Sequence, residues 1–71
     1  MTIGEKIKHY RKLSGMTQSE LAERSGIHPV TIRKYETNKL IPKTEQIIKI
    51  ANALGVLPCL FFNFNCKFRK D

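Results

Sequence analysis

Residues 16–37, MTQSELAERSGIHPVTIRKYET, contain two short helical patterns separated by a break of three residues. Thr17 and Glu20 have the spacing of a capping box, in which each side chain bonds the backbone N–H of the other residue. Gly26 ends the first helix after barely two turns, and Pro29 suits the first position of the second because its φ is fixed and its N–H is missing. The stretch therefore predicts two short helices that cross at a steep angle.

The second of these helices is predicted to extend from Pro29 to Thr37. His28, which precedes it, is a serviceable N-cap, although Ser, Thr, Asp and Asn are better. Asn38 follows the helix at a position where a left-handed residue is wanted, and Asn tolerates that conformation better than any residue except Gly.

A further helix is predicted before this stretch. Thr2 and Glu5 repeat the capping-box spacing, and Gly15 is a suitable C-terminal stop. Apolar residues recur at steps of three and four, as on one face of a helix, at Ile3, Ile7, Tyr10 and Leu13.

Another helix is predicted after the loop at 38–43, which contains Pro42. Thr44 can cap it, Gly55 ends it, and its apolar stripe consists of Ile47, Ile48, Ala51 and Leu54. Residues 56–63 can add one further turn, restricted by a proline. Because no stretch shows sustained period-two alternation, we expect an all-α fold, a compact bundle of four or five helices.

The composition sets the size of the domain and the class of partner. A chain of 71 residues has room for one domain with one modest core, which we place at residues 1–64. Lys and Arg number 13 against 6 Asp and Glu, for a net charge of +7, and the pI is near 9.8. This balance attracts polyanions, nucleic acid first, although solubility alone would also explain it. Residues 65–71 form a basic tail that we expect to be flexible.

Several other classes of protein fit the sequence poorly. Cys59 and Cys66 have no neighbouring Cys or His at ligand spacing, so we expect free thiols in a reducing cytoplasm and neither a metal site nor a disulfide framework. The N-terminal residues lack the apolar run of a signal peptide, and polar residues interrupt the apolar stretch 47–64, so we expect no membrane span. No catalytic set of side chains and no glycine-rich phosphate loop occurs, so we expect no enzyme activity, cofactor or small-molecule ligand.

Four motifs fall in register without a gap, namely MTQSELA at 16–22, Gly26-Ile27, Thr31-Ile32 and Tyr35-Glu36. In these motifs the chain resembles the phage-repressor/Cro-like (XRE-type) helix-turn-helix family, and the resemblance extends over residues 3–57. It implies a lambda-repressor-like bundle that binds palindromic or repeated operators in double-stranded DNA and acts as a repressor or an activator of nearby genes. Of these two roles we expect repression. The resemblance also implies a bacterial or phage-encoded protein of the cytoplasm.

The helix from Pro29 is the predicted reading element. If Ile32 and Tyr35 face the core, the helical period turns four residues outward, which with His28 at the helix entrance make the base-reading candidates: His28, Pro29, Val30, Arg33 and Lys34. Arg33 and Lys34 can donate to guanine O6 and N7, and Val30 can pack against a thymine methyl. The alternative for the two cations is phosphate contact or solvation.

A second set of residues is expected to contact DNA phosphates. It consists of Thr17, Gln18, Thr31, Thr37, Asn38, Lys39 and Lys43. The resemblance assigns Gln18 to a phosphate contact that also braces the reading helix, and it assigns a main-chain amide and a cation at 38–39 to the DNA backbone. The chain departs from the family at Asn38, where Gly is usual, and at Lys43, where a cap residue is usual. Arg11 and Glu36 match a family pair that links the first helix to the third.

The apolar C-terminal residues suggest a dimer. All four Phe residues lie in the last eleven positions, and a small core can use about two of them. The interface candidates are Leu57, Leu60, Phe61, Phe62 and Phe64, with the alternative that these residues complete the core. A homodimer would place two reading helices on one face of a palindromic site.

Two other functions are compatible with the sequence. An antitoxin-type module, which sequesters a partner protein and regulates its own operon, is the main alternative. An RNA-binding domain is less favoured, because the chain lacks an aromatic stacking platform near the reading helix.

Overall fold

The computed structural model describes residues 1–62, and within them the chain forms four α-helices and one 3₁₀ turn. The elements are α1 (Ile3–Leu13), α2 (Gln18–Ser25), α3 (Pro29–Glu36), α4 (Thr44–Leu54) and the 3₁₀ turn η1 (Pro58–Phe61). No strand occurs among the described residues, and the all-α prediction is confirmed. The basic tail predicted at 65–71 lies outside the described part of the chain.

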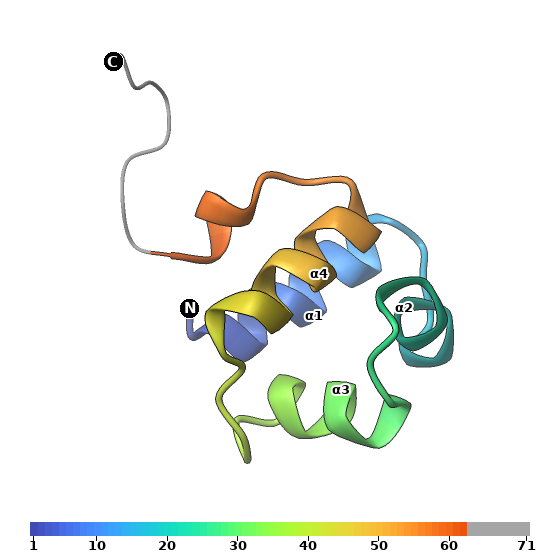
Figure 1. The fold of residues 1–71 in the computed structure, drawn as a ribbon, viewed down its shortest axis with the longest axis horizontal. Coiled ribbons are helices and arrows are strands. Elements are labelled where there is room, and N and C mark those ends of the chain that lie inside the picture. The colour runs from blue at the N-terminus through green and yellow to red at the C-terminus, as the bar shows by residue number, and fades with distance from the viewer. Residues whose placement is uncertain (63–71) are drawn as a thin grey trace.

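The helices enclose one core and leave α3 at its edge. Helix α4 packs against α1 and α2, α3 packs against α1 and α2, and η1 closes the far side against α1 and α4. In Figure 1, α3 lies along the lower edge of the molecule, with no other element beyond it. One side of α3 is therefore available to a partner.

Both predicted capping boxes are present. Thr2 Oγ1 accepts the Glu5 N–H at 3.1 Å, and Glu5 Oε1 accepts the Thr2 N–H at 2.9 Å. Thr17 and Glu20 make the same pair of bonds, at 3.1 and 2.8 Å. Gly26 ends α2 in the left-handed conformation with φ of 77°. These four side chains set the starts of α1 and α2, and Gly26 sets the end of α2, as predicted.

The later helix ends differ in detail from the prediction. Helix α3 ends at Glu36, with Thr37 as its C-cap, and Asn38 has the predicted left-handed conformation with φ of 63°. Thr44 was expected to cap α4 but is its first residue, and Lys43 is the N-cap, with no side-chain cap bond. A capping hydroxyl must belong to the residue before the helix, from which it accepts an N–H of the first turn. Thr44 is one position past that residue, which explains the error.

Two apolar residues predicted on buried faces are exposed. Leu13 is 70% exposed, because two successive three-residue steps from Ile7 fall about 120° short of two full turns. Ile48 is 40% exposed, whereas Ile50 is fully buried in its place. Ile47 is buried in the core, and Ile48 lies about 100° around the helix from it. The side chain of Ile48 is therefore directed away from the core.

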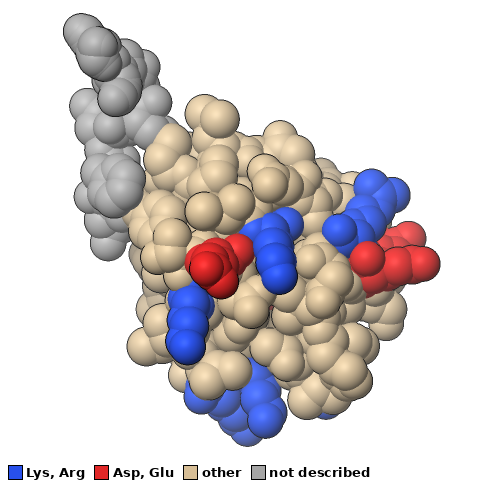
Figure 2. Space-filling view, in the orientation of Figure 1, with Lys and Arg blue, Asp and Glu red and all other residues tan. Residues whose placement is uncertain are grey.

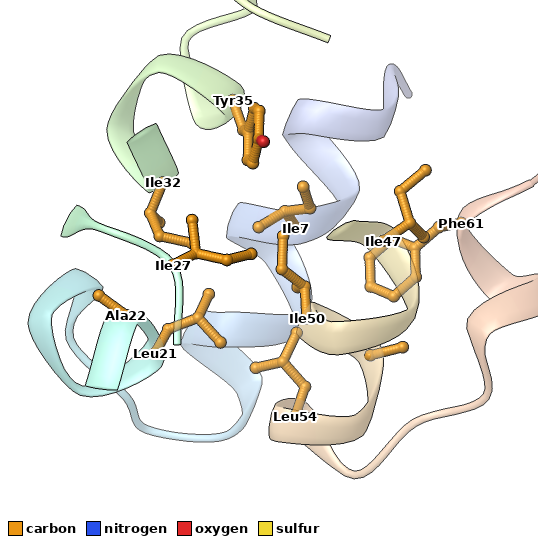
Figure 3. Packing of buried hydrophobic residues seen from close by; sticks show 11 residues of the cluster. Ile7, Leu21, Ala22, Ile27, Ile32, Tyr35, Ile47, Ile50, Leu54 and Phe61 are labelled. Carbon is orange, nitrogen blue, oxygen red and sulfur yellow. The ribbon is translucent and has the colours of Figure 1, made fainter. Parts of the chain in front are cut away.

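The core draws on all five elements. Figure 3 shows Ile7 of α1 at its centre, with Ile32 and Tyr35 reaching it from α3 and Ile50 from α4. The remaining buried apolar residues are Leu21, Ala22, Ile27, Ile47, Ala51, Leu54 and Phe61. Burial of these side chains orients the inner side of α3 and thereby its outer side.

The prediction of free thiols is wrong for Cys59, which is disulfide-bonded, and Cys66 lies outside the described residues. The spacing of the cysteines argued against a framework of several disulfides. A single disulfide does not require such a framework. Among residues 1–62, no helix has the length and apolar character that a bilayer span requires.

Candidate nucleic-acid interface

The two sides of α3 differ sharply. Ile32 is fully buried and Tyr35 is 5% exposed, so the inner side belongs to the core. Burial raises the pKa of the Tyr35 phenol, because the charged form is poorly solvated there. On the outer side Val30 is 41% exposed, and Arg33 and Lys34 are exposed. The structure therefore places an aliphatic side chain and two cations together on the uncovered face of α3.

The start of α3 is set by His28 and Pro29, both exposed. His28 Nδ1 accepts the Val30 N–H at 3.1 Å, so this nitrogen carries no proton in the cap. In the neutral ring the proton is then on Nε2, which can donate to an outside acceptor. Thr31, in the same turn, is half-buried.

A buried ion pair ties α3 to α1. Arg11 Nε donates to Glu36 Oε2 at 2.6 Å, and Arg11 Nη2 donates to Glu36 Oε1 at 3.1 Å. The side chains are 10% and 2% exposed, respectively. Arg11 Nη1 also donates to the Met16 carbonyl at 2.8 Å, and Gln18 Nε2 donates to Glu36 Oε1 at 2.9 Å. Residues of α1, α2 and the turn between them thus converge on the end of α3.

Gln18 combines this internal contact with an outward position. It is half-buried at the first position of α2, and one hydrogen of its amide nitrogen remains beside the one given to Glu36. The N–H groups of Gln18 and Ser19 have no hydrogen-bond partner within residues 1–62, as is usual in a first turn. The exposed Thr17 accepts at the cap and keeps its hydroxyl proton. This helix end offers donors to an anion.

The loop after α3 offers fewer donors than the sequence suggested. The N–H groups of Asn38, Lys39 and Leu40 donate to Tyr35 or Lys34 carbonyls, at 3.1, 2.9 and 3.3 Å. The main-chain N–H groups that were expected to contact a phosphate are therefore already engaged in hydrogen bonds that close the helix end.

The Thr37 hydroxyl is similarly occupied, because it donates to the Arg33 carbonyl at 2.9 Å. Its proton is unavailable to a phosphate in this conformation. The side chains of Asn38, Lys39 and Lys43 are exposed and remain the outward-facing polar groups of this segment.

One group of visible cations lies on the side of the molecule that α3 occupies. In Figure 2, Lys and Arg gather at the lower edge of the molecule, over the end of α3 and the loop that follows it. No Asp or Glu is visible at that edge in this view. Glu36 belongs to α3 but is buried against Arg11, so it does not expose a negative charge there.

Sequence reasoning missed Gly4, although an isolated glycine in a helical pattern is a signal of close approach. A Cβ at Gly4 would lie 2.0 Å from the Tyr35 carbonyl oxygen, so α1 and the end of α3 meet backbone to backbone. The absence of a side chain at Gly4 thereby allows the end of α3 to pack close to α1.

The predicted dimer residues divide into three groups. Phe61 is 1% exposed and packs edge-on against Tyr10, with ring centroids 5.4 Å apart, so it belongs to the core and is removed from the interface candidates. The turn opened by Pro58 directs this ring onto α1 and α4. Leu57 is 61% exposed, and Leu60 and Phe62 are half-buried. Phe64 lies outside the described residues.

The fold and this site define a class of protein. Helix α2, the Gly26 turn and the α3 helix with a free outer face constitute a helix-turn-helix unit in an all-helical domain. The family model HTH_3, described as Helix-turn-helix, matches residues 7–61. The chain belongs to the phage-repressor/Cro-like (XRE-type) helix-turn-helix family.

Relatives and solved structures agree with this membership. The cryptic phage CTXphi transcriptional repressor RstR of Vibrio cholerae is 36% identical over 56 residues, which is 79% of this chain and 50% of the repressor. The crystal structure of SinR, a master regulator for biofilm formation, in complex with DNA has a TM-score of 0.83 at 32% identity and covers 87% of this chain and 100% of that one. The P22 c2 repressor in complex with a synthetic operator has a TM-score of 0.81 at 25% identity, over 92% and 98% of the two chains.

These comparisons identify the domain as one used by DNA-binding transcriptional regulators and repressors, not by enzymes. The chain spans half or less of the length of RstR and of other curated relatives that it matches.

Proposed function

We propose that the protein is a sequence-specific regulator of transcription, acting as a repressor, that inserts α3 into the major groove of double-stranded DNA. The observation that carries the proposal is the uncovered face of α3, where Val30, Arg33 and Lys34 are exposed while the opposite side is anchored in the core. A major groove accepts one α-helix, and these side chains match its hydrogen-bond acceptors and thymine methyls.

The base contacts are assigned by chemistry. Arg33 and Lys34 donate to guanine O6 and N7, and Val30 packs against a thymine methyl. His28 presents Nε2–H and so reads an acceptor, and Pro29 contributes shape without a hydrogen bond.

The phosphate contacts flank the groove on both sides. On one side the phosphate is bound by Thr17 and Gln18 together with the free N–H groups of the first turn of α2. On the other side it is bound by the side chains of Asn38, Lys39 and Lys43. Thr31 remains a candidate for a phosphate contact, whereas the Thr37 hydroxyl already donates to the Arg33 carbonyl.

The experiment is selection of bound sites from random duplex DNA, followed by affinity measurements on the selected site. We expect Arg33→Ala and Lys34→Ala each to weaken binding by about 1–3 kcal/mol and to relax the preference at one base pair. Lys49→Ala, which removes an exposed cation from α4, is the matched control and should have little effect. If no sequence is enriched, the regulator function is refuted.

We further propose that the protein binds a palindromic or repeated operator as a homodimer. Support comes from the apolar residues that follow α4, of which Leu57 is 61% exposed and Leu60 and Phe62 are half-buried. Leu57→Asp and Phe62→Asp should dissociate the dimer and leave a folded monomer, as judged by sedimentation and circular dichroism. A wild-type chain that stays monomeric both free and on its selected site would refute the dimer.

We propose that residues 1–64 make up the DNA-binding domain and that the basic residues 65–71 lie outside it. Two of the relatives are a phage repressor of Vibrio cholerae and a regulator of Bacillus subtilis, and on these two similarities we propose a bacterial or phage-encoded protein of the cytoplasm.

A further inference from the structure

The start of α1 touches the residue that directly follows α3. Thr2 Oγ1 donates to Asn38 Oδ1 at 2.9 Å, across 36 residues of sequence. The two elements are close enough that a Cβ on Gly4 would lie 2.8 Å from the same Asn38 oxygen. The first turn of α1 therefore holds the side chain of Asn38 in place.

The amide oxygen of Asn38, rather than its nitrogen, faces α1. Thr2 Oγ1 already accepts the Glu5 N–H at 3.1 Å, so its own proton is free to donate. In the structure it donates that proton to the amide oxygen of Asn38. The Nδ2 group must then lie on the other side of the amide, and it has no hydrogen-bond partner within residues 1–62.

The outward Nδ2 group supplies a donor that the loop otherwise lacks. The backbone N–H groups of Asn38 and Lys39 are both used in closing the end of α3. Asn38 is exposed and adopts φ of 63°, a conformation that Gly would adopt without strain but without offering any side-chain donor. The presence of Asn at this position therefore adds a donor beside Lys39 at the edge of the α3 face.

We propose that Asn38 Nδ2 donates to a phosphate of duplex DNA bound along α3, and that Thr2 is a positioning residue that orients this amide. The inference rests on the proposed function. The donor is uncharged, so the contact adds affinity but releases no counterion from the DNA. An adjacent contact from Lys39 would release one.

The test uses the full chain and a duplex that carries the site selected by the wild type. Asn38→Gly preserves the left-handed backbone and removes the amide, and we expect binding to weaken roughly tenfold. Thr2→Gly removes the hydroxyl at small cost to the helix cap, and we expect a loss of about threefold to tenfold. Thr2→Ser keeps the hydroxyl and should bind like the wild type.

Two readouts separate a positioning role from a general structural effect. In the Asn38→Gly background, Thr2→Gly should cause no further loss of affinity, although its small effect on the melting temperature should persist. The losses from both variants should be the same at low and high salt, whereas Lys39→Gln should lower the slope of log affinity against log salt by about 0.9.

Each outcome bears on a different statement. Wild-type affinity in Asn38→Gly would overturn the phosphate contact. Independent, multiplying losses from the two substitutions, or no loss in Thr2→Gly, would overturn the role of Thr2 while the regulator function stands. A wild type that prefers no duplex sequence would overturn the proposed function and this inference together.

Discussion

The ion pair between Arg11 and Glu36 is expected to dominate the stability of the α1–α3 junction. Glu36→Gln would leave the guanidinium, whose side chain is 10% exposed, without its counter-charge. Arg11→Met would leave a carboxylate that is 2% exposed, with Gln18 as its remaining side-chain donor. Removing one member of a buried pair costs about 3–5 kcal/mol, because the other charge stays desolvated and uncompensated.

The double variant provides the decisive comparison. Arg11→Met with Glu36→Gln leaves no buried charge, so its cost should be well below the sum of the two single costs, with a coupling energy of at least about 2 kcal/mol. Urea unfolding at pH 7 gives the free energy of unfolding of all three variants. In thermal melts, each single variant should have a melting temperature roughly 12 °C or more below that of the wild type. Glu23→Gln, an exposed charge removal on α2, should change stability by less than about 0.5 kcal/mol.

Two results would refute this reasoning. Single-variant costs below about 1 kcal/mol would mean that solvent screens the pair as it screens surface ion pairs. Strictly additive costs would mean that the two side chains do not interact in solution.

Three other predictions test the packing that presents α3. Gly4→Ala should destabilise the fold by about 1–3 kcal/mol in urea unfolding, because its Cβ would lie 2.0 Å from the Tyr35 carbonyl oxygen; wild-type stability would show that the helices approach less closely. Burial raises the pKa of Tyr35 above 10.0, so its stabilising contribution is complete below the pKa of the unfolded chain and is lost as pH rises through the folded-state pKa. Urea midpoints should therefore fall above about pH 10 in the wild type and fall less in Tyr35→Phe, and equal profiles would contradict burial of the phenol. Phe61→Ala should cost about 3–5 kcal/mol and Leu57→Ala less than about 0.5 kcal/mol, and the reverse order would exchange their places in the fold.

The ends of the helices could be predicted because the interactions that set them are local. The capping box of Thr17 and Glu20 spans three residues, and the left-handed conformations of Gly26 and Asn38 depend on the residue itself. The same rules misplace Thr44 by one position, since a hydroxyl at either of two neighbouring positions looks equally suitable in sequence.

Burial could be predicted only in part. The period of α3 correctly placed Ile32 and Tyr35 inside, because that helix has one narrow apolar side. In α4 the apolar residues cover more than one side, and the choice of Ile50 over Ile48 depends on where neighbouring helices lie. From the sequence, Phe61 could belong either to the core or to a dimer interface. The packing of η1 against α1 and α4 places it in the core.

The sequence alone determined the order of the helices, the turn between α2 and α3, and the outward position of Arg33 and Lys34, because helical period and capping act over a few residues. Tertiary structure alone decided which donors remain free, since those depend on partners far apart in the chain. Arg11 and Glu36 meet across 25 residues, and Thr2 and Asn38 across 36. Such contacts form only when the packed core brings the helix ends together, and no local pattern encodes their geometry.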